Sequence, residues 1–567
     1  MGAGKRVVIV GGVAGGASAA ARARRLCEKS EITLIERGPH VSFANCGLPY
    51  YLGGEIPKRD SLMVQTPSSL KARFRLDVRV LTEAIHIDRA ARLVKIRDVP
   101  SGRETTLSYD ALILATGARP LLPPIPGIDR PGLFTLRNIP DMDAIDLWIR
   151  ERHARRAVVV GGGYIGLEMA EQLRVRGLEV ELAEAMPQVM MPLDPELAEL
   201  LRVELEENGV QVHLSDGVAA FEDAEPGDGV QGCVVRLTSG ARLPADVVLL
   251  GLGVRPEIGL ARDAGLVLGE LGGIRTDAGM RTSDPAIWAV GDAVEVRHGV
   301  TQEWSLLPLA GPANRQGRIA ADGIFGRDSR YRGAFGTALL RLFRLQVGCT
   351  GANSAQLLRA GIPFQAIHVH PSSHAGYFPG AEPIALKLLF HPASGRLLGG
   401  QAVGRDGVDK RIDVLATALQ AGMTVQDLAE LELGYAPPFG SAKDPVNHAG
   451  MAAGNVVHGD VQIAQWSEVA ELQASGAFLL DVRTAEERSK GAIPGSTHIP
   501  LPELRDRLGE IPVDRQIVTY CHSGQRSYAA ARLLSQLGYR VKNLSGAYAT
   551  WHSSPAASQV ADTSPKK

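Results

Sequence analysis

One cysteine of the sequence stands in a setting where a thiol could do chemistry. Cys46 lies in the run SFANCGLPY at 42–50, with Pro49 placed to open a helix just after it. A helix N-terminus favours the thiolate, the reactive form of cysteine, so this setting predicts a lowered pKa. No C-x-x-x-x-C pair is present here, which excludes an internal redox disulfide and leaves a sulfenic acid, a persulfide or a mixed disulfide as the oxidised form. A buried, inert thiol is the alternative for any isolated cysteine, and it is our interpretation of Cys27, Cys233 and Cys349.

The fifth cysteine begins a short loop, CHSGQR at 521–526. A helix is expected from about Ser527, so the backbone N–H groups of the loop would turn inward at a helix N-terminus. Such an anion nest would stabilise a thiolate or a persulfide on Cys521, assisted by Arg526. We predict catalytic roles for both residues. The alternative is a binding module without turnover.

Two glycine-rich turns predict dinucleotide sites. Each turn follows a short apolar strand, at 7–10 and 157–160, and precedes a helix and a second strand that ends in an acidic residue. This βαβ pattern places a pyrophosphate at a helix N-terminus. The predicted cofactor-binding residues are Gly11, Gly12, Ala14, Gly15, Glu36 and Arg37 in the first unit and Gly161, Gly163, Tyr164, Ile165, Gly166 and Glu184 in the second.

The two turns match the dinucleotide fingerprint to different degrees. The second turn fits G-x-G-x-x-G strictly at 161–166. In the first turn Gly12 and Gly15 fit the last two glycine positions, and Val10 stands at the first. Ordinary glycine turns of an α/β core are the alternative interpretation.

The acidic residues at the strand ends indicate the kind of nucleotide. Glu36 and Glu184 are placed to accept a hydrogen bond from a ribose 2′-hydroxyl. Glu184 would also repel a 2′-phosphate, so we favour NADH over NADPH at the second site.

An internal echo, a pair of similar segments within the chain, supports a duplicated nucleotide domain. The segment YDALILATGARP at 109–120 aligns without gaps on ADVVLLGLGVRP at 245–256.

The composition excludes several classes of protein. The 567 residues carry 61 Lys and Arg against 62 Asp and Glu, so bulk positive charge for nucleic-acid binding is absent. No uncharged apolar run reaches the ~18 residues of a membrane span. The five cysteines are too few for a disulfide scaffold, so we expect a reducing, cytoplasmic setting. His368, His370 and His374 complete no metal spacing template, and we interpret them as core or surface histidines.

Further motifs resemble the two-dinucleotide flavoprotein disulfide reductases. Asp292, in TSDPAIWAVGDAVE at 282–295, matches the residue that binds the flavin side chain in that family. Ala115, Thr116 and Gly117 match its ATG motif. The resemblance assigns FAD to the first nucleotide unit and NAD(P)H to the second.

Within these enzymes, residues 1–450 resemble the coenzyme A-disulfide reductases and the related NADH-dependent persulfide reductases. The likeness includes SFANCGLPY, Tyr377 in HAGYFPG and Tyr435 in YAPPFGSAKDPVN. It implies a homodimer in which the two tyrosines reach the partner's active site and protonate a leaving thiolate; interface or core aromatics are the alternative. It also implies that coenzyme A binds along the first helix, and the predicted contacts are Ser18, Arg22, Arg25, Ser42, Asn45 and Lys443.

Residues 461–552 resemble a rhodanese domain. The matching pieces are FLLDVRTAEERSKGAIPGSTHIP, YCHSGQRS and LSGAYATW, in that order. The predicted fold class is α/β, with two Rossmann-like dinucleotide-binding domains, an α+β dimerisation domain and a C-terminal α/β rhodanese domain. We expect an FAD-binding domain at 1–120 and 245–328, an NAD(P)H-binding domain at 121–244, a dimerisation domain at 329–450, a linker at 451–460, a rhodanese domain at 461–555 and a disordered tail at 556–567.

Together these features predict an NADH-dependent FAD oxidoreductase that reduces sulfur–sulfur bonds through Cys46. Candidate substrates are coenzyme A disulfide, coenzyme A persulfide and polysulfide, with Cys521 supplying or transferring sulfane sulfur. One alternative is an NADH oxidase or peroxidase that uses a Cys46 sulfenic acid, although the peroxidase branch has a histidine where this chain has Ala14. Another is a redox-sensing protein without turnover.

Overall fold

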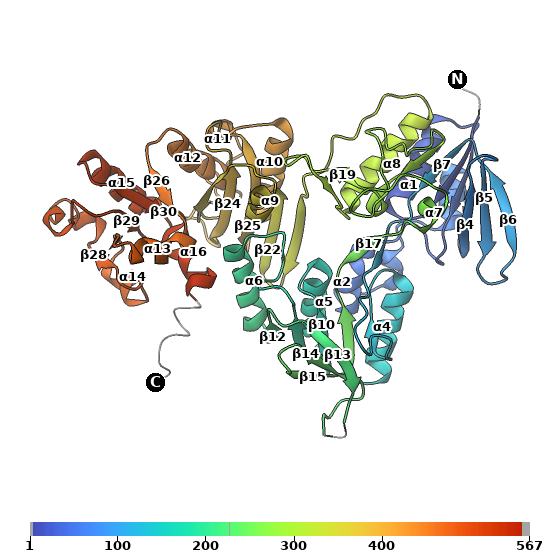
Figure 1. Ribbon diagram of the computed structural model, residues 1–567, viewed down its shortest axis with the longest axis horizontal. Coiled ribbons are helices and arrows are strands. Elements are labelled where there is room, and N and C mark those ends of the chain that lie inside the picture. Colours follow the sequence, from blue (N-terminus) through green and yellow to red (C-terminus); the bar gives the residue numbers. More distant parts are fainter. Residues whose placement is uncertain (1–3, 226, 558–567) are drawn as a thin grey trace. The chain divides into compact units, whose positions relative to one another are not determined.

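The computed structural model describes residues 4–225 and 227–557 (Figure 1). Backbone contacts divide the chain into two units, 1–187 with 209–334 and 188–208 with 335–567. Each unit has a hydrophobic core of its own. Among the described residues, no helix has both the length and the apolar character that crossing a bilayer requires.

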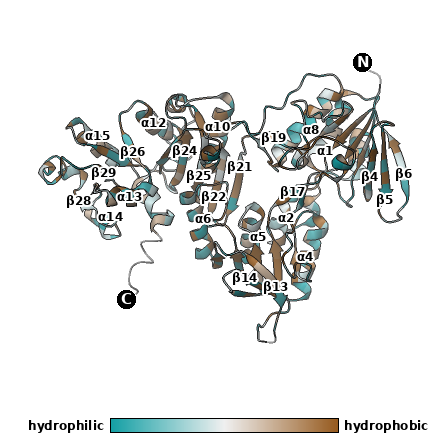
Figure 2. Ribbon diagram, viewed as in Figure 1, coloured by the Kyte–Doolittle hydropathy of each residue, from teal (hydrophilic) through white to brown (hydrophobic). Residues whose placement is uncertain are grey.

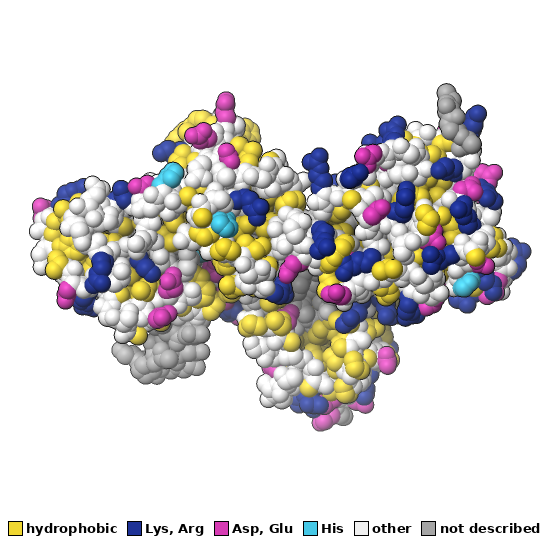
Figure 3. Space-filling view, turned by 45° about the horizontal axis from the view of Figure 1, so that its top comes forward, with side chains coloured by type: hydrophobic (Ala, Val, Ile, Leu, Met, Phe, Trp, Pro, Cys, Tyr) yellow, Lys and Arg dark blue, Asp and Glu magenta, His cyan; other side chains and the backbone are white. Residues whose placement is uncertain are grey.

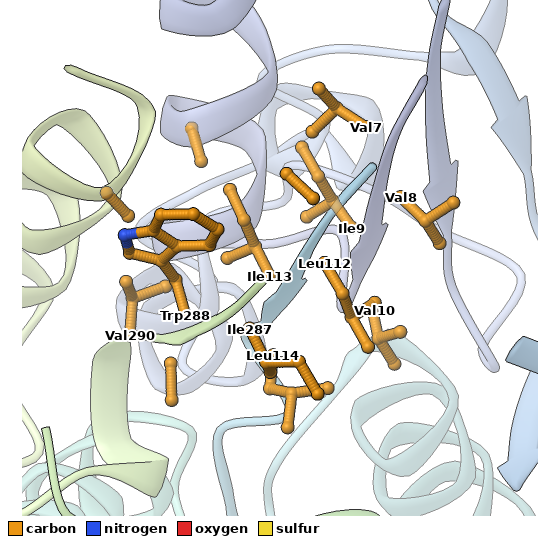
Figure 4. Close-up of a cluster of buried hydrophobic side chains, with 14 of the residues drawn as sticks. Val7, Val8, Ile9, Val10, Leu112, Ile113, Leu114, Ile287, Trp288 and Val290 are labelled. Atoms are coloured by element: carbon orange, nitrogen blue, oxygen red, sulfur yellow. The ribbon is translucent and has the colours of Figure 1, made fainter. Parts of the chain in front are cut away.

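The first unit begins with the predicted βαβ element. Strand β1 lies at the centre of a parallel sheet of order β18-β7-β1-β2-β3, because its four apolar residues after Arg6 are buried on both faces. Figure 4 shows the side chains of β1 and β7 packed in one core with Trp288 and Val290. The elements are β1 (Arg6–Val10), α1 (Ala14–Leu26), β2 (Glu31–Ile35), β3 (Asp77–Arg79), β7 (Ala111–Leu114), β18 (Ile287–Ala289) and α8 (Ala310–Ile324), which packs on α1.

A second parallel sheet repeats this plan, in the order β12-β11-β10-β16-β9. Val7 pairs with Ala111 in the first sheet and Ala157 with Val247 in the second, which are equivalent positions in the internal echo. The structure therefore supports a duplicated nucleotide domain. The elements are β9 (Leu133–Phe134), β10 (Arg156–Val160), α5 (Tyr164–Val175), β11 (Glu179–Ala183), β12 (Val210–His213) and β16 (Val247–Leu250).

Smaller elements complete the first unit. Strands β8 and β17, which follow the two echo strands, pair with each other, and two antiparallel three-stranded sheets flank the parallel ones. These elements are α2 (Leu48–Leu52), α3 (Pro67–Phe74), β4 (Thr82–Asp88), β5 (Leu93–Asp98), β6 (Glu104–Ser108), β8 (Ala118–Pro120), α4 (Ile139–Glu151), β13 (Val218–Asp223), β14 (Cys233–Leu237), β15 (Arg242–Ala245), β17 (Val254–Pro256), α7 (Gly259–Asp263), β19 (Val296–Arg297) and β20 (Trp304–Ser305).

The second unit contains an antiparallel sheet of order β21-β22-β25-β24-β23. All residues of β24 and β25 are buried, and Figure 2 shows hydrophobic residues concentrated on the strands of this sheet. Helices α10 and α12 pack against it. The elements are β21 (Ala338–Leu342), β22 (Leu345–Gly351), β23 (Gln365–Val369), β24 (Ile384–Phe390), β25 (Leu397–Gly404), α6 (Pro195–Glu207), α9 (Ser354–Arg359), α10 (Val408–Ala421), α11 (Val425–Glu430) and α12 (Pro445–Val457).

The C-terminal part of this unit is a parallel sheet of order β26-β30-β29-β27-β28 with its own core. Its elements are β26 (Gln462–Ala464), α13 (Val469–Ala474), β27 (Phe478–Asp481), α14 (Ala485–Ser489), β28 (Thr497–His498), β29 (Ile517–Tyr520), α15 (Gln525–Gln536), β30 (Val541–Leu544) and α16 (Ala547–His552). On the face drawn in Figure 3, both signs of charge are interspersed, in keeping with a net charge of −1.

Two expected boundaries differ in the structure. The segment 451–460, expected as a linker, mostly continues helix α12, because the small apolar Ala449 and Ala453 are buried and Asp444 caps the helix. Residues 188–208, expected in the NAD(P)H-binding domain, group with the second unit. The expected disordered tail lies outside the described residues from 558 onward.

Candidate active site

The first glycine turn has a backbone that only glycine can adopt. Gly11 has φ of +103°, and a Cβ there would collide with the carbonyl oxygen of Ala115. A Cβ on Gly16 would in turn collide with the carbonyl oxygen of Gly11. The turn thus brings the start of α1 against the end of β1 and against the ATG motif.

The second turn repeats these contacts and fixes the register of the fingerprint. Gly161 also has φ of +103°, and a Cβ on Gly166 would collide with its carbonyl oxygen. Gly11 and Gly16 are therefore the equivalents of Gly161 and Gly166. Val13 stands where the second turn has its middle glycine. The predicted match through Val10, Gly12 and Gly15 is one residue out of register, since the paired glycines of GGVAGG allow either alignment.

Both turns can receive a pyrophosphate. The N-cap residues of α1 and α5, Val13 and Gly163, supply no side-chain cap, so the first N–H groups of both helices are left for phosphate oxygens. Glu36 accepts hydrogen bonds from the backbone of Gly12 (2.9 Å) and Gly38 (2.8 Å). Glu184 does the same for Gly162 (2.6 Å) and Met186 (2.8 Å). Such cradles fit FAD at the first turn and a nicotinamide nucleotide at the second.

Other predicted cofactor residues cluster around the first turn. Ala115, Thr116 and Gly117 follow β7, and Thr116 donates to the carbonyl oxygen of Glu257 (2.6 Å). Asp292 lies just after β18, where burial raises the pKa of its carboxyl group. Arg137 lies near Asp292 and Glu36, and burial lowers its pKa. Sequence reasoning missed Arg137, which belongs to no motif.

Cys46 lies in a 3-10 turn, Asn45–Gly47, directly before α2. Its thiol is exposed, and its backbone N–H donates to Oδ1 of Asn45 (3.1 Å). The surrounding protein nevertheless desolvates the thiolate and raises its pKa, and the carboxylates of Glu168 and Asp292 act in the same direction. The raised pKa is opposite in direction to the predicted lowering. The helix whose dipole would favour the thiolate, α2, has only five residues.

Glu168 is a site residue that sequence reasoning missed. It lies on α5 of the second nucleotide domain, two residues after Gly166, and accepts a hydrogen bond from the hydroxyl of Tyr50 (3.1 Å). Tyr50 follows Cys46 on α2. The thiol therefore lies where the two nucleotide domains meet.

The predicted coenzyme A contacts on α1 are not all free. Arg22 forms an ion pair with Asp322 of α8 (2.6 Å), and both side chains are largely buried. Ser18 donates to Asn314 (2.5 Å), whereas Arg25 is exposed. Elsewhere, Ser42 has φ of +47° and Lys443 is exposed. The structure thus argues against Arg22 as a free phosphate ligand.

Tyr377 and Tyr435, which are 58 residues apart in sequence, meet in the second unit. Their hydroxyl oxygens are 2.7 Å apart, and this hydrogen bond raises the pKa of Tyr377. The side chains are 75% and 50% exposed, so neither is a core aromatic. Phe439 is 73% exposed as well. The surface suits contact with another chain.

The C-terminal cysteine lies at the start of the predicted loop. Cys521 directly follows β29 and is buried, and its Sγ accepts the backbone N–H of Gly524 (3.1 Å). Gly524 has φ of +105° and leads into α15. Arg526 forms two bonds to Glu487 (2.7 and 2.6 Å), which raise the pKa of the guanidinium; Cys521 contributes in the same direction. Arg526 therefore lies between a carboxylate and the thiol.

Glu487 was not among the predicted site residues. It is in α14, where it forms a capping box with Thr484, and the T-x-x-E spacing could have located it. The bond from Arg526 lowers the pKa of Glu487 to about 2. Among the described residues, no group of three His, Cys, Asp or Glu could hold a metal ion.

This geometry defines an oxidoreductase in which two dinucleotide sites converge on one thiol. The chain belongs to the pyridine nucleotide-disulphide oxidoreductases, whose family model matches residues 5–317. The dimerisation domain of that family matches 338–445, and a rhodanese-like domain matches 465–554. These matches confirm the predicted fold class, and the family uses FAD and NAD(P)H as predicted.

Individual relatives agree with the predicted resemblance. A crystal structure of reduced Bacillus anthracis CoADR-RHD is 49% identical, with a TM-score of 0.95 and 98% of each chain covered. A NAD-dependent persulfide reductase from A. fulgidus is 39% identical, with a TM-score of 0.90, over 96% of this chain and 100% of that one.

Two curated relatives match the part before the rhodanese domain. An NADH oxidase of Methanocaldococcus jannaschii is 35% identical over 447 residues, 78% of this chain and 97% of the relative. A coenzyme A disulfide reductase of Staphylococcus haemolyticus is 32% identical over 452 residues, which cover 79% of this chain and 99% of the relative. The roles of individual site residues stay predictions.

Proposed function

We propose that this protein uses NADH to reduce the sulfur–sulfur bonds of coenzyme A disulfide, coenzyme A persulfide or polysulfide. The observation that carries the proposal is the combination, in one chain, of a lone exposed Cys46 between two nucleotide domains and a second thiol, Cys521, whose sulfur accepts the backbone N–H of Gly524. The first arrangement suits thiol–disulfide exchange, and the second suits a sulfane sulfur.

The thiolate of Cys46 attacks one sulfur of the substrate. With a disulfide, the sulfur–sulfur bond breaks, a mixed disulfide forms on Cys46, and the other thiolate leaves. With a persulfide, Cys46 takes the terminal sulfur and the carrier thiolate leaves. Bound FAD would supply electrons that originate from NADH. Two electrons return Cys46 to the thiolate, with release of the second thiolate or of hydrosulfide.

Side chains of the protein position Cys46, adjust its pKa and supply a proton to the leaving thiolate. The side chain of Asn45 accepts the backbone N–H of Cys46. The negative charge of Glu168 helps to raise the pKa of Cys46 and so favours the protonated thiol. We propose a cytoplasmic homodimer in which Tyr377 and Tyr435 of one subunit reach the active site of the other and protonate the leaving thiolate. Their exposure and mutual hydrogen bond support this role.

An anaerobic assay tests the proposal. The purified protein is titrated with NADH, and NADH oxidation is then followed with coenzyme A disulfide and with coenzyme A persulfide. We expect turnover with at least one of them, and loss of turnover in Cys46→Ser. Turnover with oxygen or peroxide alone would instead favour an NADH oxidase, the function that the Methanocaldococcus relative's name suggests.

We further propose that Cys521 takes a sulfane sulfur and presents it for reduction at Cys46. The bond from Gly524 to Sγ and the nearby Arg526 would stabilise the sulfur anion. Replacing Cys521 by Ser should slow turnover with sulfane substrates and leave coenzyme A disulfide reduction unchanged. Unchanged turnover with every sulfane substrate would refute the relay.

A further inference from the structure

Two histidines that the sequence analysis assigned to core or surface lie at the junction of the dimerisation and rhodanese domains. His368 is in β23, the edge strand of the antiparallel sheet, and His370 follows two residues later. Side chains at this spacing leave an extended backbone on the same side. Both imidazoles bond to the rhodanese domain, through Ser545 and Thr550.

The contacts at this junction are short and mostly buried. Oγ of Ser545 accepts the backbone N–H of His368 (2.9 Å) and lies 3.1 Å from Nδ1 of the same residue. Nε2 of His370 is 2.7 Å from Oγ1 of Thr550. Gly546 lies between these bonds, where an added Cβ would be 2.7 Å from Cβ of His368. The turn before α16 is therefore pressed against β23.

A buried charge network fixes the orientation of the His368 ring. Oε1 of Glu196 lies 2.8 Å from Nε2 of His368 and 2.5 Å from Nζ of Lys387, which also pairs with Asp194 (2.8 Å). An ionised carboxylate can only accept, so Nε2 carries the proton and Nδ1 accepts the hydroxyl proton of Ser545. Burial lowers the pKa of His368 and, to about 3, that of His370, so the His370 ring is neutral at pH 7.

The same turn supports the loop of the reactive thiol. The backbone N–H of Tyr548 donates to the carbonyl oxygen of Cys521 (3.0 Å), and that of Ala549 donates to the carbonyl oxygen of His522 (2.9 Å). Both donors belong to the first turn of α16, which begins one residue after Gly546. A continuous set of bonds thus runs from β23 through Ser545 and α16 to the start of the Cys521 loop.

We propose that His368 and His370 are positioning residues for Cys521, so that the dimerisation domain sets the geometry of the sulfur-carrying loop. His368 holds the turn before α16 through Ser545, and His370 holds α16 itself through Thr550. Helix α16 in turn holds the carbonyl groups of Cys521 and His522. The proposal rests on the proposed function of the rhodanese domain. It implies that the domain works as a docked part of the dimerisation domain and not as a freely tethered one.

The test uses the full-length, FAD-loaded protein with His370→Ala, Thr550→Val and the double variant. Thr550→Ser restores the hydroxyl, and His391→Ala is a matched control, because the imidazole of His391 accepts the backbone N–H of Ser394 within its own turn. One readout is the pH profile of Cys521 alkylation by iodoacetamide, followed by peptide mass spectrometry. The other is sulfur transfer from thiosulfate to cyanide, with kcat and KM determined separately.

We expect kcat to fall about three- to tenfold in each single variant, the effect of losing one hydrogen bond, with KM nearly unchanged. The kcat of the double variant should be no lower than that of either single variant, because each of the two substitutions removes the same hydrogen bond. The alkylation profile should shift in the same variants, while Thr550→Ser and His391→Ala behave like the wild type. NADH oxidation with coenzyme A disulfide should stay unchanged.

Wild-type alkylation profiles in His370→Ala and Thr550→Val would overturn the proposal, as would additive losses in the double variant. Thermal unfolding confirms that the variants are folded. The alkylation profile decides the proposal even if Cys521→Ser leaves sulfur transfer intact, a result that would refute the proposed function of the rhodanese domain alone.

Discussion

The ion pair between Arg526 and Glu487 predicts which sulfur donors the rhodanese domain accepts. Two bonds of 2.7 and 2.6 Å tie the guanidinium to the carboxylate, so the carboxylate partly offsets the positive charge beside Cys521. Thiosulfate, a dianion, gains less from an arginine whose charge is partly offset, whereas a persulfide on a larger thiol depends less on that charge. Glu487→Gln should therefore raise kcat/KM for thiosulfate.

The size of the effect follows from charge and exposure. Two unit charges 4 Å apart interact by about 1 kcal/mol in bulk water and about 4 kcal/mol at an effective dielectric constant of 20. The side chains of Arg526 and Glu487 are 36% and 30% exposed, so solvent screening favours the lower part of this range. We expect a gain of about 1–2 kcal/mol, or roughly 5- to 30-fold in kcat/KM.

The assay is steady-state transfer of sulfur from thiosulfate to cyanide by the full-length protein. Glu486→Gln is the matched control, since it removes the same charge from the same helix, and Glu486 pairs with the exposed Lys490 (2.9 Å). Added salt should reduce the gain in Glu487→Gln. An unchanged or lower kcat/KM in Glu487→Gln, or an equal rise in Glu486→Gln, would refute the reasoning.

Three further perturbations test the first unit and the buried network of the second. Gly11→Ala should yield protein without the yellow flavin absorbance, because its Cβ has no room in the turn; normal absorbance would contradict the assigned register. Glu168→Gln removes a negative charge that raises the pKa of Cys46, so the alkylation profile of that thiol in flavin-free protein should move to lower pH, and an upward shift would contradict the assignment. Lys387→Met leaves two buried carboxylates without their cation and should destabilise the second unit by about 3–5 kcal/mol, measured by urea denaturation; a stability equal to the wild type would show that the network is dispensable.

Much of the architecture could be predicted from the sequence because its signals are local. The apolar strands predicted at 7–10 and 157–160 are β1, at Arg6–Val10, and β10, at Arg156–Val160. Two βαβ units with acidic strand ends could be read from spacing alone. The family match and the rhodanese-like match bear out the predicted fold class.

The remaining features depend on contacts between distant residues. The register of GGVAGG depends on which glycine faces Ala115, a residue about a hundred positions away. The expected linker is helical because its small apolar residues find a buried surface, which composition does not reveal. The pKa of Cys46 reflects desolvation by the surrounding protein and then Glu168 and Asp292, two carboxylates from other segments of the chain. Likewise, the roles of His368 and His370 depend on a domain that follows much later in sequence.

Anaerobic NADH oxidation by Cys46→Ser, compared with the wild type, tests the central claim most directly. Coenzyme A persulfide and coenzyme A disulfide serve as acceptors, and a small dye that takes electrons from bound flavin controls for intact nucleotide sites. The account predicts that the variant reduces the dye at the wild-type rate but neither sulfur compound. Sulfur-dependent oxidation at the wild-type rate would contradict the claim that Cys46 carries the electrons to the substrate.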